Sequence, residues 1–106
     1  MIKIYEGYSR FEVSYHNDLH GFDVAQMMYY LLYGDEGLIK VLQLSQVDVL
    51  ATLFAAYCHD YKHDGFNNGY HAAIKSERFR EHGADALQEK YHFAESWKVV
   101  EREDML

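Results

Sequence analysis

The chain has 106 residues, of which 49% are hydrophobic, so it suits one small globular domain and is not an intrinsically disordered chain. Its formal net charge of −7 argues against nucleic-acid binding, which needs a basic surface, and no run of about 18 apolar residues predicts a membrane span. The single cysteine, Cys58, excludes an internal disulfide and suits a reducing compartment, so we expect a cytoplasmic protein.

The first third of the chain predicts one long helix after an irregular lead-in. Residues 1–14 have no clear period, and we expect a short helix at most. Asn17 or Asp18 can then cap a helix of about 16 residues, which Gly34 ends. The expected buried stripe of this helix is Val24, Met27, Met28 and Leu31. His20 lies four residues before Val24 and therefore on the same face.

The middle third predicts a short helical segment over residues 38–44 and then a second long helix. Ser45, with Asp48 three residues later, has the spacing of a capping box at the start of this helix. The expected inner stripe is Val47, Leu50, Ala51, Phe54 and Cys58. The helix therefore delivers His59 and Asp60 at its carboxyl-terminal end, and Cys58 is interpreted as core packing.

The last third predicts a loop and two further helices. Residues 61–71 are rich in turn formers, residues 72–82 can form a short helix closed by Gly83, and residues 84–102 can form the last helix. Its expected apolar stripe is Ala86, Phe93, Trp97 and Val100, with Glu89 and His92 sharing a neighbouring face. The fold class predicted for the whole chain is all-α.

Several polar residues of this part carry no functional pattern. We interpret Lys62 and Asp64 as solvated charges of the loop, and His71 and His82 as surface residues. Tyr29, Tyr30 and Tyr33 are interpreted as packing or partner surface.

Two groups of ligand-type side chains predict a metal site. A lone histidine on an apolar helix face usually only packs in the core, but here His16 and His20 accompany His59, Asp60 and His63. His20, His59 and Asp60 are the nitrogen and oxygen donors that zinc accepts, and a second carboxylate oxygen suits Mg²⁺ or Mn²⁺. Two such cations, about 3.5–4 Å apart, can promote an in-line displacement at phosphorus. His16 lies one turn before His20 and is interpreted as a proton donor.

These residues lie in stretches that resemble motifs of the class I 3′,5′-cyclic-nucleotide phosphodiesterases, which belong to the HD-domain superfamily. The stretch YHNDLHGFDV at 15–24 is similar to the pattern Y-H-N-x-x-H-A-x-D-V, with Gly21 where alanine is usual. The stretch HDYKHDGFNN at 59–68 is similar to H-D-x-D-H-P-G-x-x-N, with Lys62 and Asp64 in place of Asp and Pro. A degenerate third motif, LQEKYHFA, is at 87–94.

The resemblance implies hydrolysis of cAMP or cGMP to the 5′-monophosphate in signal transduction, with two divalent metal ions as cofactors. It also implies a role for each matched residue. His16 would protonate the leaving 3′ oxygen, and Glu89 would orient the bridging hydroxide. His20, His59 and Asp60 would hold the zinc-type ion, with Asp60 also reaching the magnesium- or manganese-type ion. His63 would act on metal-bound water, and the pocket would be lined by Tyr15 and Asn68.

The resemblance covers about residues 15–100, whereas the family's catalytic domain is much longer and contains a further Asp ligand and a purine-binding Gln. We therefore expect residues 1–106 to be the amino-terminal to middle part of a larger helical domain, with weak or no activity alone. Two alternatives stay open: another HD-type phosphohydrolase, or a non-catalytic metal-binding or interaction module derived from a phosphodiesterase. Exposed faces carrying Met27, Met28, Tyr29 and Tyr30 would also favour association into a homo-oligomer.

Overall fold

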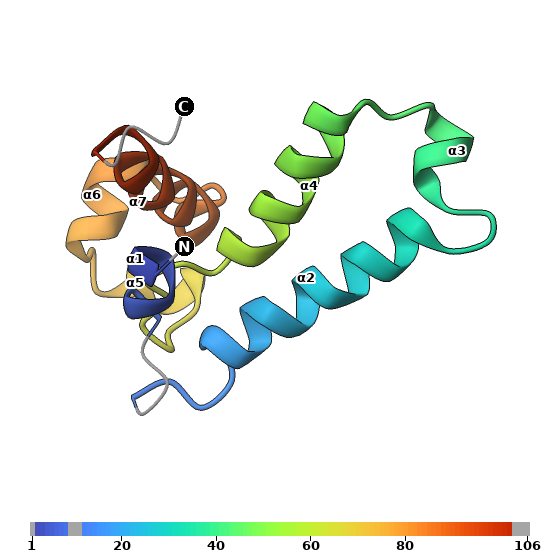
Figure 1. Cartoon of the computed structure of the whole chain (residues 1–106). Helices are drawn as coiled ribbons and strands as arrows, with labels where there is room; N and C mark the ends of the chain where they lie inside the picture. Colours follow the sequence, from blue (N-terminus) through green and yellow to red (C-terminus); the bar gives the residue numbers. More distant parts are fainter. Residues whose placement is uncertain (1, 9–11, 103–106) are drawn as a thin grey trace.

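The computed structural model describes residues 2–8 and 12–102, and these residues are helical wherever they form regular structure (Figure 1). In chain order the helices are α1 (Ile2–Glu6), α2 (Asp18–Tyr33), α3 (Leu38–Leu42), α4 (Gln46–Cys58), α5 (Asn68–Ala73), α6 (Glu77–His82) and α7 (Leu87–Arg102). The all-α prediction is confirmed. None of the helices in the described part is long and apolar enough to cross a bilayer.

The helices form two groups. Helices α2 and α4 lie side by side as an antiparallel pair, and α3 joins them at the far end (Figure 1). The short helices α1, α5 and α6 gather around α7 at the opposite end, where α2 begins and α4 ends. The functional side chains come from this junction of the two groups.

The ends of α2 and α4 follow the capping residues expected from the sequence. Asn17 Oδ1 accepts hydrogen bonds from the backbone N–H groups of Leu19 and His20 at 3.1 and 3.3 Å. Gly34 ends α2 by donating its N–H to Tyr30 O. At the start of α4, Ser45 and Asp48 form the predicted capping box, with the Ser45 N–H donating to Asp48 Oδ2 at 2.8 Å. These bonds satisfy backbone groups that would otherwise lack a helical partner.

The buried faces of α2 and α4 differ from the predicted stripes. Met27 is 60% exposed and Val47 is 74% exposed, whereas Leu32 and Val49 are buried. Apolar residues occur on more than one face of each helix, so their period alone does not select the face that packs. Only the contact between the two helices decides it.

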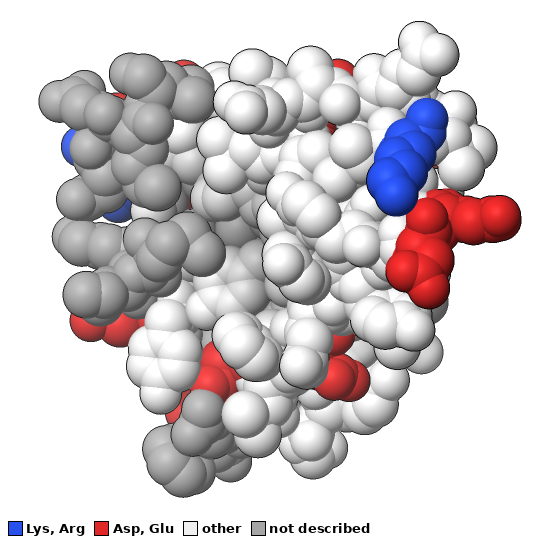
Figure 2. Space-filling model, turned by 45° about the vertical axis from the view of Figure 1, so that its right-hand side comes forward, with Lys and Arg blue, Asp and Glu red and all other residues white. Residues whose placement is uncertain are grey.

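This pair leaves many large apolar side chains on the surface. Figure 2 brings the side of α2, α3 and α4 forward and shows a face with few charged residues. The exposed apolar side chains of α2, α3 and α4 include Met27, Tyr29, Tyr30, Leu31, Tyr33, Val41, Leu42, Val47 and Leu50. Association through this face stays a prediction.

The predicted loop at 61–71 and the predicted helix at 72–82 are both wrong in part, because α5 begins inside the predicted loop and residues 74–76 interrupt the predicted helix before α6. Lys75 takes a positive φ of 50°, which a helix does not accommodate. Ser76 then starts α6, with its Oγ accepting the Phe79 N–H at 3.2 Å. Gly83 closes α6 as predicted, with a φ of +78°.

Helix α7 begins at Leu87 rather than near residue 84, because Ala86 also has a positive φ, 47°. Its predicted stripe is wrong at three positions, since Ala86 is exposed and precedes the helix, Phe93 is 70% exposed and Trp97 is 43% exposed. The buried face instead carries Leu87, Gln88, His92, Ser96, Val99 and Val100. Half of these side chains are polar, which is why hydrophobic periodicity did not indicate this face.

A small core joins the two helix groups. It consists of Ile4, Tyr8, Cys58, Tyr61 and Val99, with Phe54 and Tyr57 packed against it. Cys58 is therefore a core residue, as predicted, and burial raises the pKa of its thiol to about 11. Tyr8 donates its hydroxyl to Tyr57 O at 2.6 Å, which ties the segment after α1 to the last turn of α4.

This hydrogen bond explains the glycine at position 21. A Cβ at Gly21 would lie 2.9 Å from Tyr8 Oη and 3.1 Å from Tyr57 O, the two atoms of the bond. We expect Gly21→Ala to be more favourable in a Tyr8→Phe background than in the wild type, by roughly 1–2 kcal/mol of coupling energy. Helix propensity favours alanine by about 1 kcal/mol in both backgrounds and so cancels in the comparison. Urea unfolding of the four proteins measures the coupling, and a value near zero would contradict this account.

Candidate metal centre

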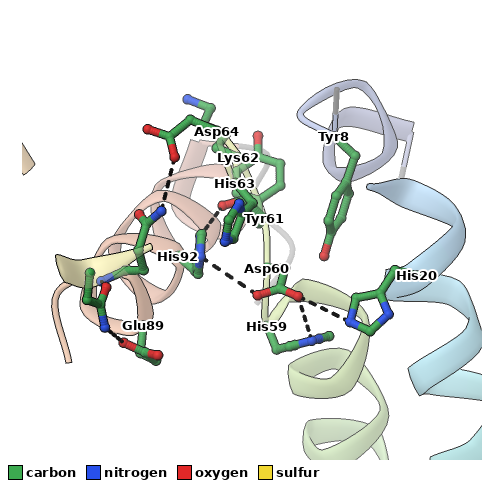
Figure 3. Close-up of polar contacts among 12 residues, drawn as sticks. Tyr8, His20, His59, Asp60, Tyr61, Lys62, His63, Asp64, Glu89 and His92 are labelled. Carbon is green, nitrogen blue, oxygen red and sulfur yellow. Dashed lines mark hydrogen bonds and ion pairs between the residues drawn. The ribbon is translucent and has the colours of Figure 1, made fainter. Parts of the chain in front are cut away.

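The site lies where four segments meet. His59 follows α4 as its C-cap and Asp60 comes next, while His20 stands in the first turn of α2 (Figure 3). His92 projects from α7, and His63 comes from the loop after α4. The Asn17 cap places His20, because it determines where α2 begins.

Three predicted ligands converge. Asp60 Oδ2 lies 2.8 Å from His59 Nε2 and 3.3 Å from His20 Nε2, and the centroids of the two imidazole rings are 5.2 Å apart. Two ligands on a tetrahedral zinc ion with bonds of about 2.0–2.1 Å are about 3.3–3.4 Å apart. The distances around Asp60 Oδ2 therefore suit a cation held by all three side chains.

Hydrogen bonding orients His59 toward that position. Its Nδ1 lies 2.7 Å from Ala56 O, and since a carbonyl only accepts, Nδ1 carries the proton and Nε2 faces Asp60. When Nε2 is protonated as well, it donates to Asp60, and this hydrogen bond raises the pKa of His59. Burial would raise the pKa of Asp60, but the hydrogen bond and charge of His59 outweigh it and lower that pKa. The carboxylate is therefore ionised at neutral pH and can act as a ligand.

A second group shares the same carboxylate: Asp60, His63 and His92 place one ligand atom each within 4.8 Å of one another. His92 is 2% exposed and its Nε2 lies 3.8 Å from Asp60 Oδ1. Sequence reasoning missed His92 as a site residue and noted only that it shares a face with Glu89. The signal that was available is its place in the third motif, three residues after Glu89.

His16 and Tyr15 lie beside these ligands. The His16 ring stacks on His63 with centroids 4.2 Å apart and lies 5.6 Å from the His20 ring. Tyr15, 64% exposed, places its ring 4.7 Å from the His20 ring, at the outer edge of the site. Burial and the nearby charges of His16 and His92 lower the pKa of His63 to about 4, so His63 is neutral at pH 7.

Glu89 and Asn68 form a pair. Asn68 Nδ2 donates to Glu89 Oε2 at 3.1 Å, and Asn68 Oδ1 accepts the Gln88 N–H at 2.9 Å. Hydrogen bonds from the Glu89 backbone N–H and from the Asn68 amide lower the pKa of the Glu89 carboxyl group, which keeps it charged. The structure thus brings Glu89 and Asn68 to each other at the start of α7.

The interpretation of Asp64 as a solvated charge is wrong. Asp64 Oδ1 accepts a hydrogen bond from Gln88 Nε2 at 3.1 Å, and Oδ2 lies 3.0 Å from His71 Nε2 and 3.6 Å from an Arg78 nitrogen. The surface interpretation of His71 is also wrong, since this residue is 4% exposed. The partners of Asp64 come from three later helices, His71 from α5, Arg78 from α6 and Gln88 from α7, an arrangement that local sequence does not encode.

Lys62 is not a free loop charge either, because its Nζ lies 2.7 Å from Glu95 Oε2 in α7. Arg78, which the sequence did not single out, donates to Lys62 O at 3.1 Å and to Gln88 Oε1 at 2.7 Å. His82 is partly covered, with 19% of its side chain exposed. The contacts of Lys62 and Arg78 attach the loop that carries His63 to α6 and α7.

The sequence of the chain is similar to that of one family of known proteins. Residues 15–106 match the family model described as 3′5′-cyclic nucleotide phosphodiesterase. The chain is 36% identical over 102 residues to the dual specificity calcium/calmodulin-dependent 3′,5′-cyclic nucleotide phosphodiesterase 1 of Drosophila melanogaster, covering 96% of this chain and 12% of that protein.

Two mammalian relatives give similar values. Identity is 32% over 99 residues to the 1B enzyme of the same name from Bos taurus, with 93% of this chain and 18% of the relative covered. It is 30% over 98 residues to the 1C enzyme from Mus musculus, with 92% and 14% covered. The chain spans less than a fifth of the length of these three relatives.

Proposed function

The chain belongs to the 3′,5′-cyclic nucleotide phosphodiesterase family, and from this we propose that its site serves metal-dependent hydrolysis of cAMP or cGMP to the 5′-monophosphate. The observation that carries the proposal is the convergence of His20 Nε2 and His59 Nε2 on one oxygen of Asp60. A charged carboxylate and two imidazoles at ligand spacing are what a hydrolytic metal centre needs.

Two divalent cations are proposed. His20, His59 and Asp60 Oδ2 suit a zinc-type ion, and Asp60 Oδ1 extends toward a second ion of the magnesium or manganese type. When bound, such cations would lower the pKa of a water molecule and neutralise charge on the phosphate.

His16 is the proposed general acid. It lies beside the ligands, stacked on His63 and 5.6 Å from His20, so it can protonate the leaving 3′ oxygen as an imidazolium. His63 is unsuited to this role because its pKa of about 4 keeps it unprotonated at pH 7. We assign His63 instead to hydrogen bonding with water at the site.

Three further residues receive supporting roles. Glu89 is charged and held by Asn68, and we propose that its carboxylate orients the attacking water. Tyr15 is exposed beside His16 and His20, where its ring can contact the bound nucleotide. Asn68 is proposed to line the same pocket.

The activity proposed here belongs to a larger unit. We propose that residues 1–106 form the amino-terminal to middle part of a catalytic domain that acts in signal transduction in the cytoplasm. The chain alone is expected to bind metal weakly. It is also expected to hydrolyse cyclic nucleotides poorly or not at all, because misplacement of the reacting groups by about 1 Å can lower the rate about 100-fold. The exposed apolar face over α2 to α4 favours a second candidate function, a metal-binding interaction module.

Metal analysis of the purified chain, together with hydrolysis of cAMP and cGMP by a catalytic domain that contains it, tests the proposal. We expect Zn²⁺ to bind the chain, binding to be lost in His20→Ala and His59→Ala, and the catalytic domain to hydrolyse at least one of the two nucleotides. A folded chain that binds no Zn²⁺, or binds it equally well without His20 and His59, would overturn it. Metal binding without hydrolysis by the catalytic domain would favour the interaction module.

A further inference from the structure

Gln88 is a buried glutamine whose side chain uses both of its N–H donors. The residue is 4% exposed. Its Nε2 atom donates to Asp64 Oδ1 at 3.1 Å and to Phe66 O at 2.8 Å, and its Oε1 atom accepts from Arg78 Nη1 at 2.7 Å. Because an amide donates only from its nitrogen and accepts only at its oxygen, these partners fix which way the amide group faces.

The backbone of the same residue makes a third contact with the loop. Gln88 is the second residue of α7, and the first four N–H groups of a helix have no acceptor within the helix. The Gln88 N–H donates instead to Asn68 Oδ1 at 2.9 Å, so a side chain 20 residues earlier caps α7. Gln88 thus holds residues 64, 66 and 68, every second residue of the segment that leads from α4 into α5.

This segment depends on the residues that this chain carries. Gly65, Phe66 and Asn67 are all exposed, and Gly65 takes a φ of +86°. Proline, which the pattern H-D-x-D-H-P-G-x-x-N has at position 64, would restrict φ but has no side-chain acceptor. Asp64 stands there in this chain, and its carboxylate accepts from the amide of Gln88. The contact is therefore a property of this chain and not of the motif.

The contacts continue to Glu89, the residue next to Gln88. The amide of Asn68 connects the two, because its Oδ1 accepts the Gln88 N–H and its Nδ2 donates to Glu89 Oε2 at 3.1 Å. One planar amide makes both hydrogen bonds, so a displacement of Asn68 disturbs both. Glu89 is exposed, and the bond from Asn68 restricts the rotamers that its side chain can adopt.

We propose that Gln88 is a positioning residue for Glu89. It holds the segment 64–68 against the start of α7, and this segment in turn holds the Glu89 carboxylate through Asn68. The inference deepens the proposed function and rests on it in taking Glu89 as the group that orients the attacking water. Misplacement of a reacting group by about 1 Å can lower a rate about 100-fold, so a residue need not touch the substrate to affect turnover.

Hydrogen exchange of the backbone N–H at position 88 tests the contact in the chain itself. Gln88→Met keeps a similar helix propensity but has no N–H donor in its side chain. We expect exchange at position 88 to become about 10-fold faster or more, as in Asn68→Ala, while exchange inside α4 stays unchanged. Gln88→Glu keeps an acceptor for Arg78 but loses both donors, so it should resemble Gln88→Met. The control is Gln46→Met, at an exposed glutamine in the first turn of α4, which should leave exchange at position 88 unchanged.

Kinetics separate positioning from a purely structural role. In a catalytic domain that contains the chain, Gln88→Met should lower kcat about 10-fold or more, with KM and metal content within about twofold of the wild type. Only kcat should fall, because Glu89 is proposed to act on water and not on the substrate or the cations. A purely structural role would instead lower kcat and metal content together, in proportion to the amount of folded protein.

The outcomes distinguish this inference from the proposed function. Unchanged exchange at position 88 in Gln88→Met, equal acceleration inside α4, or unchanged turnover in an active domain would overturn the inference and leave the proposed function standing. Exchange in Gln88→Glu like that of the wild type would overturn the inference as well, because the N–H donors would then hold nothing. A wild-type domain that hydrolyses neither nucleotide would overturn the proposed function, and exchange at position 88 would still decide whether Gln88 holds Asn68.

A measurement on the wild type covers the case in which Gln88→Met does not fold. The side-chain N–H groups of Gln88 should exchange about 10-fold more slowly or less than those of Gln46, because the Gln88 amide is buried and hydrogen-bonded whereas Gln46 is exposed. Equal exchange at the two glutamines would overturn the proposal.

Discussion

Asp60→Ala is expected to remove both cations and to reduce turnover to the background of the assay. Among the residues that the structure describes, Asp60 alone belongs to both ligand groups, with Oδ2 toward His20 and His59 and Oδ1 toward His92. Its loss also leaves three imidazoles close together without the negative charge that attracts a cation. The measurement is metal analysis beside initial rates of cyclic-nucleotide hydrolysis, made in a catalytic domain that contains the chain.

His16→Ala is the matched comparison. This side chain lies beside the ligands and is not among them, so its removal should leave the metal content intact. Loss of a general acid typically lowers the rate by about 10²–10⁴-fold. If His16→Ala loses its metal, or if Asp60→Ala keeps normal turnover, the roles assigned to the two residues are wrong.

Asp64→Ala is expected to destabilise the chain by about 2–3 kcal/mol at pH 7, through the loop that carries His63. The carboxylate accepts from Gln88 Nε2, from the Phe66 N–H and from His71, and it lies 3.6 Å from Arg78. Removing it leaves these donors with unsatisfied hydrogen bonds and a partly buried positive charge. The value is moderated because 30% of the Asp64 side chain is exposed.

The effect of Asp64→Ala on the free energy of unfolding should also depend on pH. Burial would raise the pKa of Asp64, but the hydrogen bonds from Phe66, His71 and Gln88 and the charge of Arg78 lower it below its ordinary value of 3.8. Because the folded pKa is the lower one, the stabilisation is complete above that ordinary value and is lost as pH falls below it. The difference between wild type and variant should therefore narrow in acid.

Urea unfolding of Asp64→Ala across this pH range, beside the exposed Asp35→Ala, makes the comparison. Replacing an exposed loop carboxylate should change the free energy of unfolding by no more than about 0.5 kcal/mol. Equal effects of the two substitutions at pH 7 would show that the contacts of Asp64 contribute nothing, and would restore the interpretation of Asp64 as a solvated charge.

The sequence by itself determined the helix class, several helix ends and one half of the site. Asn17, Ser45 and Gly34 form hydrogen bonds with backbone groups a few residues away, so the helix ends that they set can be predicted without tertiary structure. The stretches around His20 and around His59 and Asp60 could likewise be identified as motifs from the sequence, and the structure brings these three side chains together.

The tertiary structure alone decided which helix faces are buried and what completes the site. Apolar side chains occur on several faces of α2 and α4, so the choice between Leu32 and Met27 depended on how the two helices pack. His92 is hydrogen-bonded to Tyr61, 31 residues earlier, and Asp64 is contacted by Arg78 and Gln88 from later helices. Such contacts join residues distant in the chain, and neither helical periodicity nor capping carries information about them.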